Sequence, residues 1–515
     1  MTEPLDPSSL PEPVDVSDDA AALAAVDAVI AAGPFDATWE SLRSYRPPRW
    51  YREGRFGIFL HWGAYSVPAF DNEWYPRNMY RQGSRAFEHH RATYGAQDRF
   101  GYKDLIPHFR MEHFDPAAWA ALFRRSGAQF VVPVAEHHDG YALYDTARSR
   151  WKAPQIGPRR DVFGELLAAV DAQWMIRGAS THRAEHWFFL NGGTAFESDV
   201  RDPAYADLYG PAARKEISPT ERFLEDWMLR TVEIIDGYRP QILYFDTGIE
   251  EPSFDPYVRR VAAYFYNRAA EWGREVVITA KWGAFPPGAA VTGIERGTMG
   301  GIQPEVWQND TAVSRTSWSW VEGHDYKEVD EVLAELADVV AKNGNLLLNV
   351  GPRPDGTIPE HEVRMLERIG DWLARNGEAV YGTAPWVLFG EGPTRSAAGA
   401  FVDGSPVRYT DADLRFTTRS SVGHDYVYAI ALQAPEEGRV RVRSFAPGAG
   451  LLGRAVADVR VLGWTGPIDW RLDDEHLVVT IPSGLSPLDG GPVVRIELAA
   501  DIPAERTDAF YGLWI

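Results

Sequence analysis

The sequence contains no cysteine in its 515 residues. This absence excludes disulfides, thiolate metal sites and thiol nucleophiles together. Positive charge is also in deficit, because 52 basic residues face 73 acidic ones and leave a formal net charge of −21. Such a chain repels phosphate backbones and anionic bilayers, so we expect neither nucleic acid nor a membrane as a partner. No uninterrupted apolar run is long enough to span a bilayer.

The first 46 residues lack the features of a folded domain. They are rich in proline and aspartate at first and then in alanine, and an apolar spacing across residues 20–32 predicts one short helix. We interpret this region as a tail that lies on the main body of the protein. Its first basic residue is Arg43, so it lacks the charged beginning of a secretory signal, and we expect a cytoplasmic protein.

Aromatic residues are abundant, at 13 % of the chain with 19 tryptophans. So many aromatic rings indicate either a large core or a site that stacks on a ligand, and sugar rings are a common stacking partner. The hydrophobic share of 45 % and the charged share of 24 % are typical of a globular chain. The length predicts two or three domains.

Residues 47–385 alternate between short apolar runs and helical patterns. Strands that are apolar on both faces and alternate with helices are typical of a parallel sheet covered by helices. This α/β pattern favours a (β/α)8-like barrel with long insertions, and an open doubly wound sheet is the alternative. The apolar runs lie at residues 56–60, 130–134, 174–176, 242–245, 276–280 and 346–350. The helical patterns lie at 162–172, 223–235, 258–272, 329–340 and 363–373, and after Asp115 as an N-cap.

The pattern changes near residues 383–389. The following runs are short, rich in β-branched residues and separated by glycine, proline and aspartate, which is typical of an antiparallel β-sandwich. We therefore predict a second domain at residues 386–515. Its strands are expected at 427–432, 439–442, 459–462, 477–481 and 493–498.

Polar residues gather just after the apolar runs of the predicted barrel. The reactive groups of such barrels lie at the C-terminal ends of the strands. Buried polar groups are destabilising unless they have partners, so a ring of them over an apolar barrel indicates a functional site. The ring comprises His61 and Trp62, residues 136–140 and 182–187, Asp246, Lys281 and Trp282, and Glu295 and Arg296.

Several motifs together resemble the retaining α-L-fucosidases of glycoside hydrolase family 29. They run in the family's order from about residue 47 to 383, and the resemblance implies a barrel followed by a β-sandwich. The motifs are RFGIFLHWG at 55–63, SVP at 66–68, EWY at 73–75, HHDG at 137–140, RDVFGEL at 160–166, YFD at 244–246, NGNLLLNVGP at 343–352 and NGEAVYG at 376–382.

Two carboxylates are the candidate catalytic residues. Asp246 follows an apolar run, where a glycosyl nucleophile must stand, and the resemblance implies this role for it. A retaining mechanism needs a second carboxylic acid about 5–5.5 Å away, first as acid and then as base. Glu295 and Glu305 are both candidates, and we favour Glu295 because several family members place the acid/base there.

Eight further residues are candidate substrate ligands. An imidazole can donate and accept hydrogen bonds in a fixed plane, which suits recognition of sugar hydroxyls. The resemblance implies that histidines hold the fucose hydroxyls and that a tryptophan packs on the apolar face and C6 methyl of the sugar. The candidates are His61, Glu73, Trp74, His137, His138, Tyr244, Lys281 and Trp318.

Two positions depart from the family pattern. Lys281 stands where many members have arginine, and Gln308 stands where many have glutamate. A lysine is a point charge without the bidentate fork of arginine, so the fine specificity of the pocket is expected to differ. Two histidines four residues apart, His182 and His186, are a weak metal candidate. Glu185 precedes the second histidine, whereas the metalloprotease motif has glutamate directly after the first, so we predict no metal and no cofactor.

These observations favour an exo-acting retaining α-L-fucosidase that acts on fucosylated oligosaccharides or glycoconjugates. One alternative keeps the mechanism and changes the sugar, for example to an α-L-galactoside. The other is a catalytically silent carbohydrate-binding protein, against which the presence of both Asp246 and Glu295 argues. The oligomeric state is not predicted.

Overall fold

A computed structural model describes residues 4–16, 19–421, 423–451 and 453–499 of the chain. Eight parallel strands follow one another around a closed barrel, in which the first strand pairs with both the second and the eighth. The predicted barrel is therefore confirmed, and the open sheet is excluded. The strands are β1 (Phe56–Leu60), β2 (Phe130–Glu136), β3 (Ile176–Thr181), β4 (Ile242–Phe245), β5 (Val277–Ala280), β6 (Val291–Glu295), β7 (Trp307–Ala312) and β8 (Gly344–Val350).

Burial on both faces explains why the apolar runs form strands. Every residue of β1, β2, β4, β5 and β8 is buried, so these strands cannot alternate between apolar and polar residues. Neighbouring strands also approach closely. A Cβ atom at Gly57 on β1 would lie 2.1 Å from ring carbons of Phe130 on β2, so only glycine fits at this position.

Three strands differ from the expectation. The predicted run at 174–176 lies mostly before β3, because Trp174 is 92 % exposed and the strand begins only at Ile176. The apolar pattern does not predict β6 or β7. All of β7 is buried although it contains Gln308 and Asp310, and both find partners inside the barrel. The Tyr51 hydroxyl donates to Gln308 Oε1 at 2.9 Å, and the Tyr244 hydroxyl donates to Asp310 Oδ2 at 3.0 Å.

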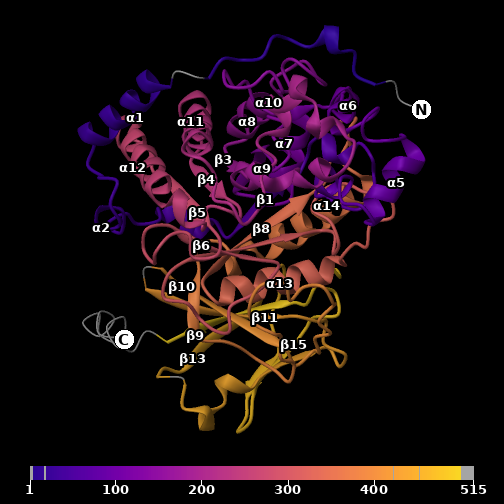
Figure 1. The fold of residues 1–515 in the computed structure, drawn as a ribbon. Coiled ribbons are helices and arrows are strands. Elements are labelled where there is room, and N and C mark those ends of the chain that lie inside the picture. The colour runs from indigo at the N-terminus through magenta and orange to yellow at the C-terminus, as the bar shows by residue number, and fades with distance from the viewer. Residues whose placement is uncertain (1–3, 17–18, 422, 452, 500–515) are drawn as a thin grey trace.

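Helices cover the outside of the barrel (Figure 1). Asp115 caps the first of the predicted ones, since its carboxylate accepts from the backbone N–H groups of Ala117 and Ala118, each at 3.0 Å. The predicted helices all form, and several extend one to three residues beyond the predicted ends. They are α7 (Pro116–Arg125), α8 (Val162–Ala172), α11 (Glu221–Tyr238), α12 (Asp255–Trp272), α13 (Val329–Ala341) and α14 (Glu360–Asn376).

The N-terminal region lies against the barrel helices. Its helix α1 (Ala20–Ala32) packs beside α12, with Val26 buried between them (Figure 1). An ion pair of 2.6 Å joins Asp19, just before α1, to Arg148 of the barrel. Farther toward the N-terminus, the backbone N–H of Leu5 donates to the Asp104 carboxylate at 2.7 Å.

Two antiparallel sheets form the C-terminal part, and they share one apolar core, as the predicted sandwich requires. Helix α13 lies between the barrel and the larger sheet (Figure 1), where Asp338 forms a buried ion pair of 2.6 Å with Arg415. Residues 500–515 of the predicted domain lie outside the described residues. The larger sheet has the order β13 (Val456–Val461), β16 (Val493–Leu498), β11 (His424–Ala431), β10 (Leu414–Ser421), β9 (Ala384–Glu391). The smaller one has the order β12 (Arg439–Val442), β15 (Leu477–Thr480), β14 (Trp470–Leu472).

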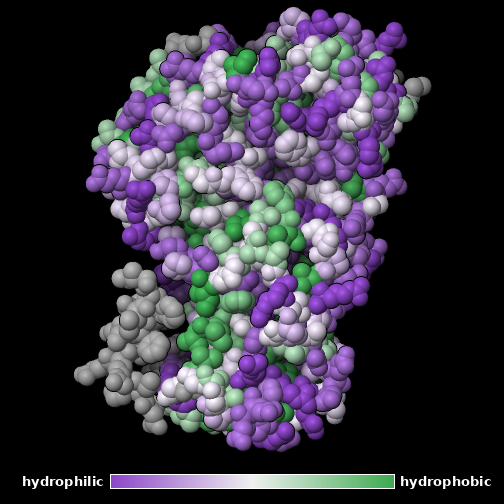
Figure 2. Space-filling view, turned by 60° about the horizontal axis from the view of Figure 1, so that its bottom comes forward, coloured by the Kyte–Doolittle hydropathy of each residue, from purple (hydrophilic) through white to green (hydrophobic). Residues whose placement is uncertain are grey.

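The surface is largely hydrophilic, in keeping with the charged composition. Figure 2 shows one face on which polar residues predominate and apolar residues gather near the middle of the view. Among the helices of the described residues, none combines the length and the apolar character needed to cross a membrane.

Candidate active site

A cavity of about 580 Å³ opens at the C-terminal ends of the barrel strands. Successive strands each carry a polar side chain to its wall, as the sequence pattern predicts. His61 follows β1, His137 and His138 follow β2, His182 follows β3, Asp246 follows β4, Lys281 follows β5, and Glu295 ends β6. Residues far apart in the chain therefore meet in one site because the barrel places all its strand ends at the same rim.

Asp246 lies at the centre of this site with both carboxylate oxygens engaged. Lys281 Nζ donates to Oδ1 at 2.7 Å, His182 Nδ1 lies 2.9 Å from Oδ2, and His138 Nε2 lies 3.3 Å from the same oxygen. Burial alone would raise the pKa of this carboxyl. The Lys281 ammonium and the two imidazoles outweigh burial and hold the pKa of Asp246 well below its usual range. Asp246 is therefore an anion in the folded protein.

Lys281 connects three carboxylates. In addition to Asp246, its ammonium lies 2.8 Å from Glu295 Oε2 and 3.2 Å from Asp310 Oδ2. The side chain is buried, which favours the neutral amine, but the three acidic neighbours raise the pKa of Lys281 well above its usual value. One cation thus holds the two candidate catalytic carboxylates on either side of itself.

The two candidates for the second carboxylate lie at opposite ends of the barrel. Glu295 ends β6 and lines the cavity next to Lys281. Glu305 is exposed and precedes β7, so it lies at the N-terminal end of a neighbouring strand, away from the cavity. The structure therefore brings Glu295, and not Glu305, to Asp246.

Four buried histidines form one wall of the cavity. Burial lowers the pKa of His61 and of His137 well below the usual value, so both rings are neutral and each can donate one hydrogen bond and accept another. For His138 burial is outweighed by Asp246 and Glu185, and its pKa is raised. The Nδ1 atoms of both His137 and His138 are buried; that of His138 lies 4.0 Å from Glu185 Oε2, and that of His137 makes no hydrogen bond to any described residue.

The predicted aromatic and acidic ligands also reach the cavity. Glu73 accepts a hydrogen bond of 2.9 Å from the backbone N–H of Trp318, and burial raises the pKa of this carboxyl. The Trp318 ring lies 5.1 Å from the His61 ring, and the Trp74 ring lies 5.6 Å from the His138 ring. Asn349 fixes this corner, since it bonds both His61 Nδ1 at 2.8 Å and the Trp318 carbonyl at 2.6 Å.

Tyr244 is the one predicted ligand that the structure does not bring to the cavity surface. It is fully buried below the cavity, where its hydroxyl donates to Asp310 and its ring lies under the Lys281 ammonium at 5.6 Å. Its position suits support of Lys281 and not contact with a ligand.

His182 and His186 do not face each other. His186 Nδ1 lies 2.8 Å from the backbone oxygen of His138, on the outer side of the wall. Among the described residues, the candidate metal-ligating groups with atoms within 4.8 Å are His61, His137 and His182, and His138, His182 and Asp246. In the second group Asp246 already takes its hydrogen bonds from the imidazoles and Lys281.

Several cavity residues were not among the predicted site residues. His182 occupies the same position after its strand as His61 does, and this signal could have found it. Glu185, which lines the cavity beside His138, follows on the next short helical turn. Phe401 comes from the C-terminal part of the chain, and Asp310, which contacts Lys281 without lining the cavity, lies inside a polar strand, so no local pattern marks either of them.

Known proteins resemble this chain over most of its length. Residues 22–378 match the alpha-L-fucosidase family model. The plasma alpha-L-fucosidase of Homo sapiens is 29 % identical over 459 residues, which cover 87 % of this chain and 88 % of that protein. The alpha-L-fucosidase of Dictyostelium discoideum is 29 % identical over 416 residues, or 78 % and 81 % of the two chains.

A solved structure is similar over nearly the same extent. The crystal structure of the Thermotoga maritima alpha-fucosidase in complex with fucose superposes with a TM-score of 0.68 at 26 % identity, covering 90 % of this chain and 100 % of that one. The resemblance seen in the sequence motifs is thus confirmed. The chain belongs to the α-L-fucosidases, glycoside hydrolase family 29.

Proposed function

We propose that this protein is an exo-acting retaining α-L-fucosidase that works by double displacement. In the first step an oxygen of Asp246 forms a bond to the anomeric carbon while the bond to the leaving oxygen breaks, and that oxygen takes the proton of Glu295. In the second step Glu295 takes a proton from water, the water oxygen bonds to the anomeric carbon, and the Asp246 carboxylate is released.

The position of Lys281 between the two carboxylates carries this proposal. Retaining glycosidases hold their carboxyl groups about 5–5.5 Å apart, whereas inverting enzymes leave about 6.5–9.5 Å for a water molecule. Lys281 Nζ lies 2.7 Å from an Asp246 oxygen and 2.8 Å from a Glu295 oxygen. These two oxygens can therefore be no farther apart than the sum of both distances, which supports the retaining class.

The charge state of Asp246 also supports its role as nucleophile. A carboxylate must be ionised to attack, and Lys281, His182 and His138 stabilise the anion by lowering its pKa. The same groups stabilise the carboxylate when it is released in the second step.

The cavity supports recognition of a single terminal sugar. Its volume of about 580 Å³ lies in the range of small-molecule pockets. His61, His137, His138 and Glu73 line the cavity and provide hydrogen-bond groups for hydroxyls. Trp318 and Trp74 provide apolar faces, and burying one methyl group is worth about 0.8 kcal/mol, which would favour fucose over an L-sugar with a hydroxyl there.

The anomeric configuration of the first product tests the mechanism. Proton NMR of the early hydrolysis of 4-nitrophenyl α-L-fucoside should show α-L-fucose before mutarotation. Initial β-L-fucose would contradict double displacement. The matching α-L-galactoside should turn over more slowly than the fucoside. Faster turnover of the galactoside would identify α-L-galactosides as the preferred substrates. Folded protein that hydrolyses neither glycoside would support the silent binding protein.

A further inference from the structure

Two exposed aromatic rings stand at the mouth of the cavity. Trp282 is 46 % exposed and Phe401 is 60 % exposed, and both line the same cavity as Asp246. Their rings are nearly parallel, at 19° with centroids 5.9 Å apart. Among the large exposed apolar residues that the structure describes, these two are the ones that border the cavity. Exposed apolar surface that borders a binding cleft marks an interaction site.

Both rings are tied to the catalytic carboxylates through the backbone. Trp282 directly follows Lys281, which contacts Asp246 and Glu295. The backbone N–H of Phe401 donates to the carbonyl oxygen of Glu295 at 2.9 Å, and the next residue, Val402, donates to the carbonyl of Arg296 at 2.8 Å. The ring pair therefore lies on the Glu295 side of the cavity, opposite the histidines.

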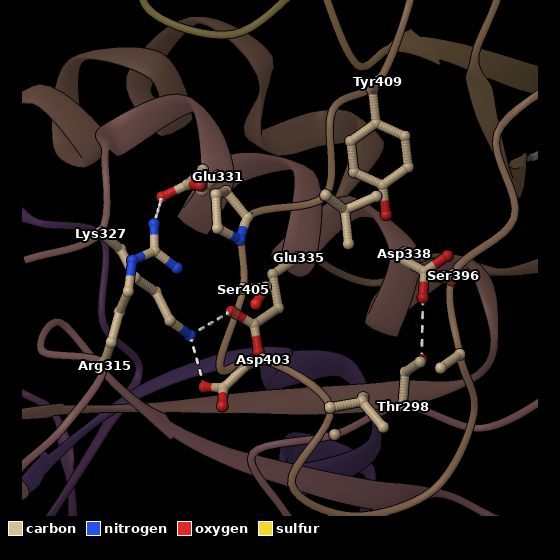
Figure 3. A pocket seen from close by; sticks show the side chains of 15 residues that line it. Thr298, Arg315, Lys327, Glu331, Glu335, Asp338, Ser396, Asp403, Ser405 and Tyr409 are labelled. Carbon is tan, nitrogen blue, oxygen red and sulfur yellow. Dashed lines mark hydrogen bonds and ion pairs between the residues drawn. The ribbon is translucent and has the colours of Figure 1, made fainter.

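A charged cluster fixes the segment that carries Phe401. This segment, residues 396–409, leaves the C-terminal sheets and runs over a second, smaller cavity of about 90 Å³ (Figure 3). Lys327 Nζ donates to Asp403 at 2.7 Å and to Glu335 at 3.0 Å, and Thr311 Oγ1 donates to Asp403 at 2.9 Å. The charges of this cluster are already paired, so it serves as an anchor for the segment.

The backbone at both rings is in an unfavourable conformation. Trp282 and Phe401 each have φ of 55°, in the left-handed region that bulky side chains avoid. Such strain persists only where the surrounding structure enforces it, and it collects at ligand sites. The hydrogen bonds to Glu295 and Arg296 and the anchor at Asp403 provide that enforcement for Phe401.

We propose that Trp282 and Phe401 form the subsite for the leaving group, and that this subsite takes a pyranose that presents a flat face of C–H groups. The inference rests on the proposed function, because the acid/base must protonate the leaving oxygen and the leaving group must then lie beside Glu295. The face of an aromatic ring is electronegative and attracts C–H groups, and contact removes apolar surface of both from water.

The test compares two substrates that share fucose and differ in the leaving group. A fucosyl-galactose disaccharide fills the subsite, whereas α-L-fucosyl fluoride has a single atom there. In Trp282→Ala and in Phe401→Ala the ratio of kcat/KM for the disaccharide to that for the fluoride should fall on the order of tenfold. Trp282→Phe and Phe401→Tyr retain a ring and should keep most of the ratio. Trp174→Ala removes a still more exposed tryptophan at the other end of the barrel and should leave the ratio as in the original protein.

An unchanged ratio in either alanine variant would overturn the two-ring subsite. Failure of the original protein to hydrolyse fucosyl fluoride would count against the proposed function instead, since the fluoride needs Asp246 but no leaving-group subsite. Thermal unfolding of each variant shows whether it is folded. If Trp282→Ala is unstable, Phe401→Ala still tests the proposal, because the Phe401 ring is 60 % exposed and its removal leaves no buried cavity.

Discussion

The two sides of the cavity are built differently. The histidine wall (His61, His137, His138 and His182) follows β1, β2 and β3 and is buried throughout. The rim (Trp282, Glu295 and Phe401) comes from β5, β6 and a segment of the C-terminal part, and all three residues are at least partly exposed. Asp246 contacts His182 and His138 of the wall, whereas Glu295 lies at the rim. The side chains of these two candidate catalytic carboxylates are 11 % and 15 % exposed, so they differ in their neighbours more than in their burial.

This difference separates two tasks. Buried imidazoles with fixed partners are preorganised, which suits recognition of one sugar and stabilisation of the Asp246 anion. An exposed rim can accept leaving groups of different size and can exchange water between the two steps. Changes in the wall should therefore affect all substrates alike, and changes in the rim should depend on the leaving group.

The largest expected effect is loss of the nucleophile. Asp246→Gly should lower kcat by about 10⁴-fold or more on every fucoside, good or poor leaving group, because the covalent step is removed. Azide should restore part of the activity by attacking the anomeric carbon from the vacated space. Far-UV circular dichroism and thermal unfolding control for folding, and near-normal turnover by the variant would contradict the assignment of Asp246.

Removal of the acid/base should show the leaving-group dependence expected of the rim. General acid catalysis contributes typically 10²–10⁴-fold and is needed most when the leaving group is poor. Glu295→Ala should therefore slow a fucosyl disaccharide by about 10³-fold and a dinitrophenyl fucoside far less. Glu305→Ala is the matched control, since Glu305 is exposed at the opposite end of the barrel and should change neither rate. Equal losses of activity on both substrates would contradict the assignment of Glu295 as the acid/base.

The sequence predicts the wall far better than the rim, and the reason is physical. A strand buried on both faces is usually apolar, so the apolar runs predict β1, β2, β4 and β8. The residues that follow these strands can then be identified from the sequence. By contrast, β7 is buried although it is polar, because Gln308 bonds Tyr51 across a sequence separation of 257 residues. The local sequence around β7 therefore does not show that Gln308 has a buried partner.

The position of Phe401 at the cavity cannot be predicted from the sequence for the same reason. It reaches the cavity because residues 396–409 pair with the segment after β6, where the backbone N–H of Thr298 lies 3.2 Å from the carbonyl of Gly399 and that of Gly399 lies 2.8 Å from the carbonyl of Thr298. This pairing joins two parts of the chain that the composition assigns to different domains. The cavity therefore draws residues from both sides of the boundary predicted near residue 385.

Lys281 links the two sides, and its replacement should give the next largest effect. Lys281→Met should lower kcat/KM by about 10²-fold, because the transition state loses its nearest cation. It should also raise the pKa of Asp246, since burial would then be opposed by the imidazoles alone. The acidic limb of the pH–rate profile should accordingly move to higher pH. Lys281→Arg keeps the charge and should show a smaller loss of kcat/KM and little shift of the acidic limb. An acidic limb that does not move in Lys281→Met would show that Lys281 does not lower the pKa of Asp246.

A chelator should have no effect on either side of the cavity. Both oxygens of Asp246 are already bonded to Lys281 and to imidazoles, so the nucleophile has its positive partners within the protein. Rates measured before and after dialysis against EDTA should agree within error. A loss that zinc restores would assign a metal to His61, His137 and His182 instead.

The smallest expected effect concerns a carboxyl that is buried like that of Asp246 but takes no hydrogen bond from a lysine or a histidine. Glu362 on α14 accepts hydrogen bonds from the backbone N–H of Gly351 at 3.0 Å and from the Tyr326 hydroxyl at 3.2 Å. Burial raises its pKa to about 8, and these hydrogen bonds and Arg353 offset burial only in part. The same burial thus yields an anion next to Lys281 and a neutral acid at Glu362.

This contrast predicts how stability depends on pH. Between the unfolded pKa of about 4.3 and the folded pKa of about 8, the folded state keeps a proton on Glu362 that the unfolded state has lost. The free energy of unfolding therefore falls as pH rises through this window. Glu362→Gln removes the titration and keeps the shape, so its Tm should fall less between pH 5 and pH 8 than that of the original protein. Glu360→Gln, an exposed position on the same helix, should keep the original slope. If the Tm of Glu362→Gln and that of Glu360→Gln depend on pH with the same slope, Glu362 is ionised in the folded protein. The lack of a hydrogen bond from a lysine or a histidine would then not be what separates Glu362 from Asp246.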